Sequence, residues 1–420
     1  MLQKRSSPSL YIPKTEFSQK RETGPMKQGL DGSKTAYLVI LLLGVVSLLG
    51  DIVYEGSRGV VPEYLRFLGA TGLVIGLAGG LGDFLGYAMR LVSGFLVDTT
   101  RAYWFFIFLG YGLIIVIPLL GIFPSLEIAI MLVLLERIGK AVRAPSRDTV
   151  LSLVSKGVGT GKAFGIHELL DQTGAILGPL IVATLMFFNA SEYRSTFAFL
   201  FIPFIMLLIV LVYTYKRISQ KIAGAMPPRT EKKGRLAKPF YIYTFAVLLN
   251  TVGLIPYTLI LYKAAQILPT QQWIVPLIYL LIQGVDAPAA LLSGYAFDKV
   301  GTKILVLPFL LSVFPPLFAT FNTSLGMLLV AAAIYGIVLG MQESVYRAAV
   351  SEFSPVSSRG TAYGIFNTAY GIGFLISGAI YGLLIDLAIS FSVVLFYALV
   401  AQTVATTLLL KLRPTPKEEK

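Results

Sequence analysis

The sequence has few charged residues and no cysteine. Charged side chains make up 14% of the 420 residues, whereas a soluble domain usually carries about 25%. Hydrophobic residues make up 55%, and the mean hydropathy is +0.76. This composition excludes a disordered chain and an ordinary soluble enzyme, and it predicts a protein with many membrane-spanning segments. The absence of cysteine excludes disulfides, thiolate metal sites and a cysteine nucleophile.

Histidine is nearly absent, since His167 is the only one. One histidine with scattered carboxylates does not form a typical metal site, and no clustered catalytic pattern is present. The segment 156–163 resembles a phosphate loop but lacks its first glycine and its hydroxyl residue. We therefore expect no metal, no cofactor and no enzymatic activity, and a membrane-embedded enzyme is an improbable alternative.

Apolar runs recur from Tyr37 to the end of the chain, and about 20 residues suffice to cross the hydrocarbon core. Because a backbone in lipid must satisfy its own hydrogen bonds, these runs predict helices. The predicted fold is an all-α polytopic membrane protein with twelve transmembrane helices in two pseudo-symmetric six-helix bundles. The twelve segments are 37–58, 71–97, 103–122, 128–150, 161–188, 195–215, 239–262, 272–297, 303–321, 325–347, 360–385 and 390–411.

The net charge of +13 is distributed as expected for a membrane protein rather than a nucleic-acid-binding one. With a cytoplasmic N-terminus, 28 of the 35 Lys and Arg residues fall on the cytoplasmic side. Three lie inside spans, and the other four are predicted on the non-cytoplasmic side of the membrane: Arg58, Arg66, Arg194 and Lys263. By the positive-inside rule, both termini are predicted to be cytoplasmic in a multi-pass protein of the plasma membrane.

A basic segment with two prolines, 216–238, divides the spans six and six. The predicted domains are a disordered cytoplasmic tail 1–35, an N-terminal bundle 36–215, the cytoplasmic linker 216–238, a C-terminal bundle 239–411 and a cytoplasmic tail 412–420. Similar peptides recur about 200 residues apart, such as Ala163–Ile166 and Ala362–Ile365. Repeats of this kind build transporters whose substrate site lies between the repeats near the midplane.

The chain resembles the major facilitator superfamily from the first helix to the twelfth. The residues that carry the resemblance between helices 8 and 9 are Gly294, Asp298, Lys299, Gly301 and Lys303. A degenerate copy between helices 2 and 3 keeps Gly94, Asp98 and Arg101. Helix 5 has the small-residue motif Gly174, Gly178 and Pro179, similar to part of the motif of antiporter branches. The string Arg137–Asp148 resembles a prokaryotic branch whose substrates are generally unassigned.

The resemblance implies a gate on the cytoplasmic side. Asp98 would reach the start of helix 11 near Gly360, and Asp298 the start of helix 5 near Gly161. The physical basis is that a carboxylate accepts hydrogen bonds from the free N–H groups at a helix start, where the dipole is positive. Five further charges are expected to join this network: Arg143, Arg147, Asp148, Glu343 and Arg347.

Ionisable residues inside the spans point to a transport site, because each costs roughly 2.5–3.5 kcal/mol at mid-bilayer unless it faces a cavity or a partner. We expect Asp171 or Asp83 to be the proton-coupling acid, with Asp51 third, and Asp171 or Glu168 to form a titratable pair with Arg137. The predicted cavity residues are Asp51, Asp83, Arg90, Glu136, Arg137, Lys140, Glu168, Asp171, Asn250, Asp286 and Asn367.

Function is predicted as secondary active transport of a small organic solute by alternating access. Proton-coupled export of an amphipathic or cationic compound is the leading hypothesis, since buried acids are abundant. The alternative is uptake or exchange of an anionic metabolite held by Arg90, Arg137 and Lys140; a channel is less consistent with the repeat. The expected partners are the solute, protons and the lipid bilayer, with no nucleic acid, and the chain is expected to be monomeric.

Overall fold

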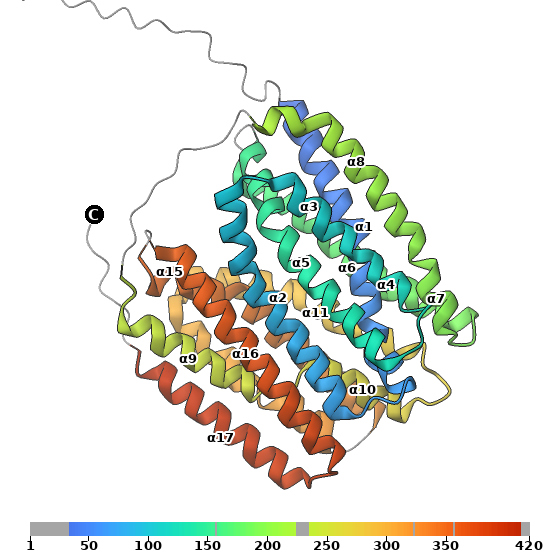
Figure 1. Cartoon of the computed structure of the whole chain (residues 1–420). Coiled ribbons are helices and arrows are strands. Elements are labelled where there is room, and N and C mark those ends of the chain that lie inside the picture. Colours follow the sequence, from blue (N-terminus) through green and yellow to red (C-terminus); the bar gives the residue numbers. More distant parts are fainter. Residues whose placement is uncertain (1–32, 156–157, 224–234, 322–323, 356–357, 413–420) are drawn as a thin grey trace, which may run out of the picture.

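The computed structural model describes residues 33–155, 158–223, 235–321, 324–355 and 358–412, and these contain helices but no strand (Figure 1). The N-terminal half comprises α1 (Ser33–Phe67), α2 (Gly72–Thr100), α3 (Tyr103–Gly112), η1 (Leu113–Ile115), α4 (Val116–Leu119), α5 (Leu126–Ser155), α6 (Thr160–Phe188), α7 (Tyr193–Phe199) and α8 (Phe201–Ala223). The C-terminal half comprises α9 (Lys238–Val252), α10 (Tyr257–Ile267), α11 (Ile274–Val300), η2 (Gly301–Leu305), α12 (Val306–Leu311), α13 (Phe314–Phe321), α14 (Leu325–Met341), the π-helical turn η3 (Gln342–Tyr346), α15 (Arg347–Phe353), α16 (Arg359–Asp386) and α17 (Phe391–Leu410).

Each of the twelve predicted segments is mainly helical in the structure, although residues 253–256 interrupt the segment 239–262. Within the described part of the chain, nine helical stretches are long and apolar enough to cross a membrane. One of them, Ile274–Phe321, has 48 residues and contains two predicted spans, which meet at Gly301 with a φ of 63°. The stretch Tyr103–Leu119 is shorter but apolar, and α5 includes charged residues that lower its hydropathy. The prediction of an all-α polytopic fold is confirmed.

The first helix is longer than the sequence suggested, because α1 continues to Phe67 rather than ending at residue 58. Arg58, expected in an outside loop, therefore lies within the helix. Its charge is neutralised there by Glu55, with 2.5 Å between Nη1 and Oε1, and by Glu136 at 3.7 Å. Ion pairing thus offsets part of the cost of placing a cation at this position.

The predicted tails lie outside the described residues except for 33–35 and 412, and so does the middle of the linker. Helix α8 runs to Ala223 and α9 begins at Lys238, so helix occupies the first eight residues of the segment predicted as linker. We call the end of the molecule where α8 stops and α9 begins the linker end, and the opposite end the far end. Helices α2 and α16, from the two halves, lie side by side along their length (Figure 1).

Glycines let the two halves approach closely at the far end. The backbones of Gly76 in α2 and Gly378 in α16 are in direct contact. A Cβ atom at Gly80 would lie 2.6 Å from the carbonyl oxygen of Phe374, and one at Gly382 would lie 2.6 Å from the carbonyl oxygen of Gly72. Side chains at these positions would force the helices apart, because backbone atoms cannot move aside as a flexible side chain can.

Small residues also join α1 to α6 within the N-terminal half. A Cβ at Gly174 would lie 2.8 Å from the Asp51 Cβ, and one at Gly178 would lie 2.7 Å from the backbone nitrogen of Gly56. The helix 5 motif of the sequence therefore serves close helix packing, the arrangement typical of small residues in membrane helices. This packing fixes the position of the polar residues that follow on both helices.

Replacing Gly378 by alanine is expected to destabilise the protein by about 1–3 kcal/mol, the usual cost of overpacking. The reason is that the added methyl group meets the backbone of Gly76. The matched control is Gly112→Ala in α3, because a Cβ there has no neighbour within 4 Å. The midpoint of thermal unfolding in detergent should fall for Gly378→Ala alone; an unchanged midpoint would contradict the packing argument.

Candidate functional site

A cavity of about 260 Å³ lies between the two halves, and its walls are unusually rich in charge. Eight carboxylates line it: Asp51, Glu55, Asp83, Asp148, Glu168, Asp171, Asp286 and Glu343. Seven cations line it as well: Arg58, Arg90, Arg137, Lys140, Arg143, Arg147 and Arg347. Aromatic and neutral polar side chains complete the walls, among them Tyr87, Tyr257, Tyr279, Gln283 and Tyr335.

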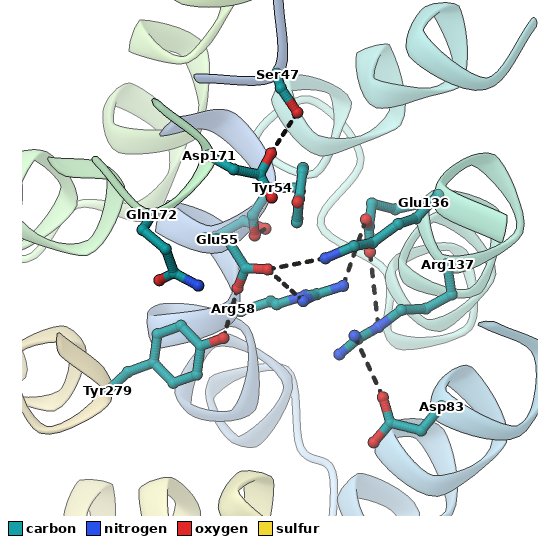
Figure 2. A network of polar contacts seen from close by, with 12 residues as sticks. Ser47, Tyr54, Glu55, Arg58, Asp83, Glu136, Arg137, Asp171, Gln172 and Tyr279 are labelled. Atoms are coloured by element: carbon teal, nitrogen blue, oxygen red, sulfur yellow. Dashed lines mark hydrogen bonds and ion pairs between the residues drawn. The ribbon is translucent and has the colours of Figure 1, made fainter. Parts of the chain in front are cut away.

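An arginine of α5 organises the central part of the cavity wall. Arg137 Nη1 lies 3.3 Å from Asp83 Oδ1 of α2, and its Nε lies 3.6 Å from Glu136 Oε2 (Figure 2). Glu136 also pairs with Arg58 of α1 at 3.7 Å. Glu136 itself is buried behind the wall rather than lining the cavity. The ion pairs hold three helices of the N-terminal half at fixed rotations.

Glu55 forms a second junction of the same network. Its carboxylate accepts from Arg58 at 2.5 Å, from Lys140 at 3.2 Å and from the Tyr279 hydroxyl at 2.5 Å (Figure 2). Sequence reasoning placed Glu55 near the outer boundary and did not include it or Arg58 in the site. The signal that could have found them is their spacing of three residues, which brings opposite charges together on a helix.

Two tyrosines of the C-terminal half close the cavity toward the far end. Tyr257 begins α10, just after Pro256 interrupts the helix, and its hydroxyl accepts a hydrogen bond of 2.8 Å from Arg137. Tyr279 of α11 donates to Glu55, and the two tyrosine rings lie 5.1 Å apart. These contacts between halves are hydrogen bonds to neutral hydroxyls, which separate at lower cost than ion pairs.

Asp171 pairs with Arg147, not with Arg137 as the sequence analysis expected. Arg147 Nη1 lies 3.8 Å from Asp171 Oδ1, and Ser47 donates a hydrogen bond to the same carboxylate. Arg147 also pairs with the adjacent Asp148 at 2.9 Å. The reason is depth: at about 1.5 Å per residue, Arg147 and Asp171 are similarly distant from the linker end, whereas Arg137 lies much deeper.

Four carboxylates of the cavity form no ion pair with another described residue. One is Asp51 of α1, and the other three are Glu168 of α6, Asp286 of α11 and Glu343 of η3. Glu168 accepts only from Gln172, at 3.2 Å. Asp286 is 3% exposed, and its Oδ1 atom has no hydrogen-bond partner in the described structure. We call these three residues the acidic wall; both halves of the molecule contribute to it.

The remaining predicted cavity residues divide into two groups. Asp51, Asp83, Arg90, Lys140 and Asp171 line the cavity with the acidic wall. Two amides do not. Asn250 is fully buried within the C-terminal half, where it donates to Gln402 at 2.7 Å and accepts from Tyr346 at 2.7 Å. Asn367 of α16 is half-buried and is not part of the cavity wall.

Residues predicted for the gate occupy two different places. The loop-motif residues Gly94, Asp98, Arg101, Gly294, Asp298, Lys299, Gly301 and Lys303 lie at the linker end of α2 and α11 and in η2. Asp98 and Asp298 are exposed, and no hydrogen bond or ion pair between described residues joins either one to the opposite half. By contrast, Arg143, Arg147, Asp148, Glu343 and Arg347 line the cavity.

A carboxylate does contact a helix start across the two halves, but at the far end. Asp386, the last residue of α16, accepts hydrogen bonds from the backbone N–H groups of Gly72 at 2.7 Å and Leu73 at 2.8 Å. Both N–H groups belong to the first turn of α2, where the helix dipole favours a negative charge. We call this contact the Asp386 latch; no motif in the sequence indicated it.

Comparison with known proteins assigns the family. The family model described as Major Facilitator Superfamily matches residues 40–307 and 240–420. The chain belongs to the major facilitator superfamily. It is therefore a membrane transporter of that type and not an enzyme. Like other members, it takes a small-molecule solute as its substrate class.

Two relatives within this superfamily align with most of the chain. An uncharacterized protein of Mycobacterium tuberculosis is 34% identical over 374 residues, covering 87% of this chain and 91% of that protein. An uncharacterized MFS-type transporter of Methanocaldococcus jannaschii is 28% identical over 353 residues, covering 82% and 88%. These matches extend over both halves, so the superfamily assignment applies to the chain from α1 through α17.

Solved structures of superfamily type share the fold at low identity. The nucleoside transporter NupG superposes with a TM-score of 0.69 at 14% identity, over 89% of this chain and all of that one. A D-xylose-proton symporter superposes with a TM-score of 0.67 at 14% identity, over 91% and 98%. At such identities the likeness shows the fold alone.

Replacing Arg137 alone should destabilise the protein more than replacing both Arg137 and its partner Asp83. Arg137→Gln leaves Asp83 buried without a cation, so we expect a loss of about 3–5 kcal/mol. Adding Asp83→Asn should restore much of it, because no uncompensated charge remains. Unfolding midpoints of the two single variants and the double variant measure the coupling; strictly additive losses would show that the pair does not act as a unit.

Removing the Asp386 latch should loosen the far end. In Asp386→Ala, the N–H groups of the first turn of α2 lose the hydrogen-bond acceptor that the C-terminal half supplies. The mean distance between the halves at the far end should then increase, or the distribution of that distance should become broader. Because the chain has no cysteine, spin labels at Phe67→Cys and Ser390→Cys report this distance without background. Glu192→Ala, which removes a far-end carboxylate within one half, is the control; identical distance distributions in all variants would refute a latching role.

Proposed function

We propose that the chain is a proton-coupled secondary transporter that exports a solute bearing a cationic group, working by alternating access. The cavity supports this proposal because both halves line it. At the far end, the glycine contacts, Tyr257, Tyr279 and the Asp386 latch bring the halves together. At the linker end, the loop-motif carboxylates Asp98 and Asp298 form no hydrogen bond or ion pair with the opposite half among the described residues. The described conformation is consistent with a cavity accessible from the linker end.

The proposal places the linker end in the cytoplasm and the protein in the plasma membrane as a monomer. The basic residues near that end, such as Lys299, Lys303 and Arg359, follow the positive-inside rule. The two bundles 36–215 and 239–411 would rock against each other, and Asp98 and Asp298 would engage the starts of α16 and α6 when the linker end closes. The observation in favour is that a Cβ atom at Gly360 or Gly161 would have no neighbour within 4 Å, so an approaching side chain would meet no obstacle on that side.

The acidic wall is the observation that carries the cationic assignment. Most other carboxylates of the cavity are engaged: Asp83 by Arg137, Glu55 by Arg58 and Lys140, and Asp148 and Asp171 by Arg147. The acidic wall has no ion pair within the described residues, so a proton or a cationic solute can neutralise its charge. Burial favours the neutral form of a carboxyl group, and a cation favours its charged form.

Asp286 is the proposed exchange site. It is the most buried member of the acidic wall, and its Oδ1 lacks a partner in the described structure. One carboxylate that binds either a proton or a cationic group, but not both, couples the two movements in opposite directions. Asp171 and Asp83, the acids favoured by the sequence, are already paired with arginines and would have to break those ion pairs first.

The structure gives less support to the alternative that Arg90, Arg137 and Lys140 hold an anionic metabolite. It relied on Arg137 and Lys140, and both are neutralised by carboxylates of their own half. Among the three proposed anion-binding cations, Arg90 alone has no ion pair within the described residues. A cavity whose deepest arginine is fully compensated does not offer a strong site to a purely anionic solute.

Replacing Asp286 by asparagine should abolish proton-driven exchange. In proteoliposomes with an imposed pH gradient, we expect transport of a cationic probe, selected by counterflow from a panel of amines, to fall at least tenfold for Asp286→Asn. Exchange of the probe without a gradient should lose its pH dependence. Glu352→Gln, an exposed carboxylate outside the cavity, is the matched control. Full gradient-driven transport by Asp286→Asn would overturn the assignment.

A further inference from the structure

Two arginines from opposite halves line the cavity without forming an ion pair. Arg90 belongs to α2 and Arg347 to α15, and both contribute to the cavity wall. Within the described residues, neither guanidinium makes a hydrogen bond or an ion pair. Arg90 lies over the ring of Tyr87, 5.4 Å from its centroid, and its buried Nε atom has no hydrogen-bond partner. Arg347 is among the charges that act on Arg90.

These arginines differ from every other cation in the cavity. Arg58, Arg137, Lys140 and Arg147 each pair with a carboxylate. Arg143 stacks against Tyr54 and Tyr111 and donates to the carbonyl of Gly110 at 3.5 Å. A guanidinium that lines a cavity without an ion pair or hydrogen bond to a described residue has donors available to a ligand, so the two arginines together indicate a binding role.

The chemistry of two guanidinium groups indicates the ligand. Each presents a planar fork of N–H donors that matches the oxygens of a carboxylate or a phosphate, and bidentate pairs of this kind are stronger than neutral hydrogen bonds. Asp148 and Arg147 also act on Arg90, but Asp148 is already held by Arg147 at 2.9 Å. Glu343 and Glu168 act on Arg347, but the guanidinium groups of Arg90 and Arg347 form no ion pair with a described residue, so their N–H donors are available to a ligand.

The acidic wall lies beside this positive pair. Glu343 and Arg347 are four residues apart on one helix, about 6 Å along its axis, and the structure shows no ion pair between them. Glu343 belongs to the π-helical turn η3, a type of irregularity that is frequent at functional sites. The cavity thus has a negative and a positive surface at a short distance from each other.

We propose that Arg90 and Arg347 form an anion subsite, and that the transported solute is dipolar. Its cationic group occupies the acidic wall, and its carboxylate or phosphate bridges the two arginines. This inference deepens the proposed function and rests on it for the cationic group. Because Arg90 and Arg347 come from different halves, the anionic group contacts both halves at once, which ties solute binding to the approach of the two halves.

Binding of matched probes to the purified chain tests the subsite. The probes are ω-amino acids from glycine to 6-aminohexanoate, phosphoethanolamine as the phosphate form, and pentylamine and pentanoate as singly charged controls. Calorimetry should show the best dipolar probe binding at least tenfold more tightly than either control. In Arg90→Gln/Arg347→Gln this advantage should disappear while the affinity for pentylamine changes less than twofold.

Two further variants separate the possible outcomes. Arg90→Lys/Arg347→Lys keeps the charge without the fork and should retain part of the advantage, which also shows that the site folds. Arg66→Gln, at the far end, should change nothing. A dipolar advantage that survives Arg90→Gln/Arg347→Gln, or no dipolar probe binding more tightly than pentylamine, would overturn the subsite.

The outcomes distinguish a failure of the anion subsite from a failure of the proposed function. Binding of pentanoate that depends on the two arginines, without any binding of pentylamine, would support the anion subsite and count against cation export. Pentylamine binding that requires Asp286, together with no effect of the arginine variants on any probe, would support cation export and overturn the dipolar solute.

Discussion

Mutual neutralisation of buried charges on the first six membrane segments is the interaction on which the rest of the structure depends. Every ion pair between described residues lies within the N-terminal half, and none joins the two halves. Arg137 between Asp83 and Glu136 fixes the rotations of α2 and α5, because breaking one buried partner leaves an uncompensated charge. The contacts across the halves are of a different kind: tyrosine hydroxyls, glycine backbones and one carboxylate at a helix start. A rocking movement can therefore separate the halves without breaking a single one of these ion pairs.

The two halves share a topology, but they satisfy their buried polar groups in different ways: the N-terminal half uses ion pairs and the C-terminal half uses hydrogen bonds between neutral side chains. The C-terminal half has a neutral network in its core, in which Asn250, Gln402, Gln342 and two tyrosines satisfy one another. Such a network requires no charge to be compensated within that half. Its carboxylates at Asp286 and Glu343 are consequently not needed for packing, and they face the cavity. The C-terminal half thus contributes Asp286 and Glu343 to the charge that the solute would meet, and the N-terminal half contributes Glu168.

The sequence predicted the spans well because length and apolarity alone decide whether a helix crosses a membrane. It predicted depth along each helix, but it did not predict rotation, which depends on the neighbours a helix packs against. Asn250 and Asp286 are both polar residues deep in spans, yet one is satisfied in the core and the other lines the cavity. The sequence analysis assigned Arg58 to the outer side of the membrane because a single cation ends an apolar run. The structure shows instead that Arg58 pairs with Glu136 of another helix. The Asp386 latch joins the end of α16 to the start of α2, and these partners are 314 residues apart in the sequence. No local sequence pattern could therefore indicate it.

The same two helices, α2 and α16, have a carboxylate near one end of each, and this arrangement supports the alternating-access proposal. The end of α16 accepts the start of α2 through Asp386, whereas Asp98 near the end of α2 would face the start of α16. Under the proposed mechanism, each closed end would have a carboxylate opposite a helix start, with a similar electrostatic stabilisation. Two stabilisations of similar size would keep the two end states close in free energy, so that a modest binding energy could shift the population. A solute that bridges Arg90 of α2 and Arg347 of the opposite half would act at the linker side of this helix pair, where closure of the cavity must begin.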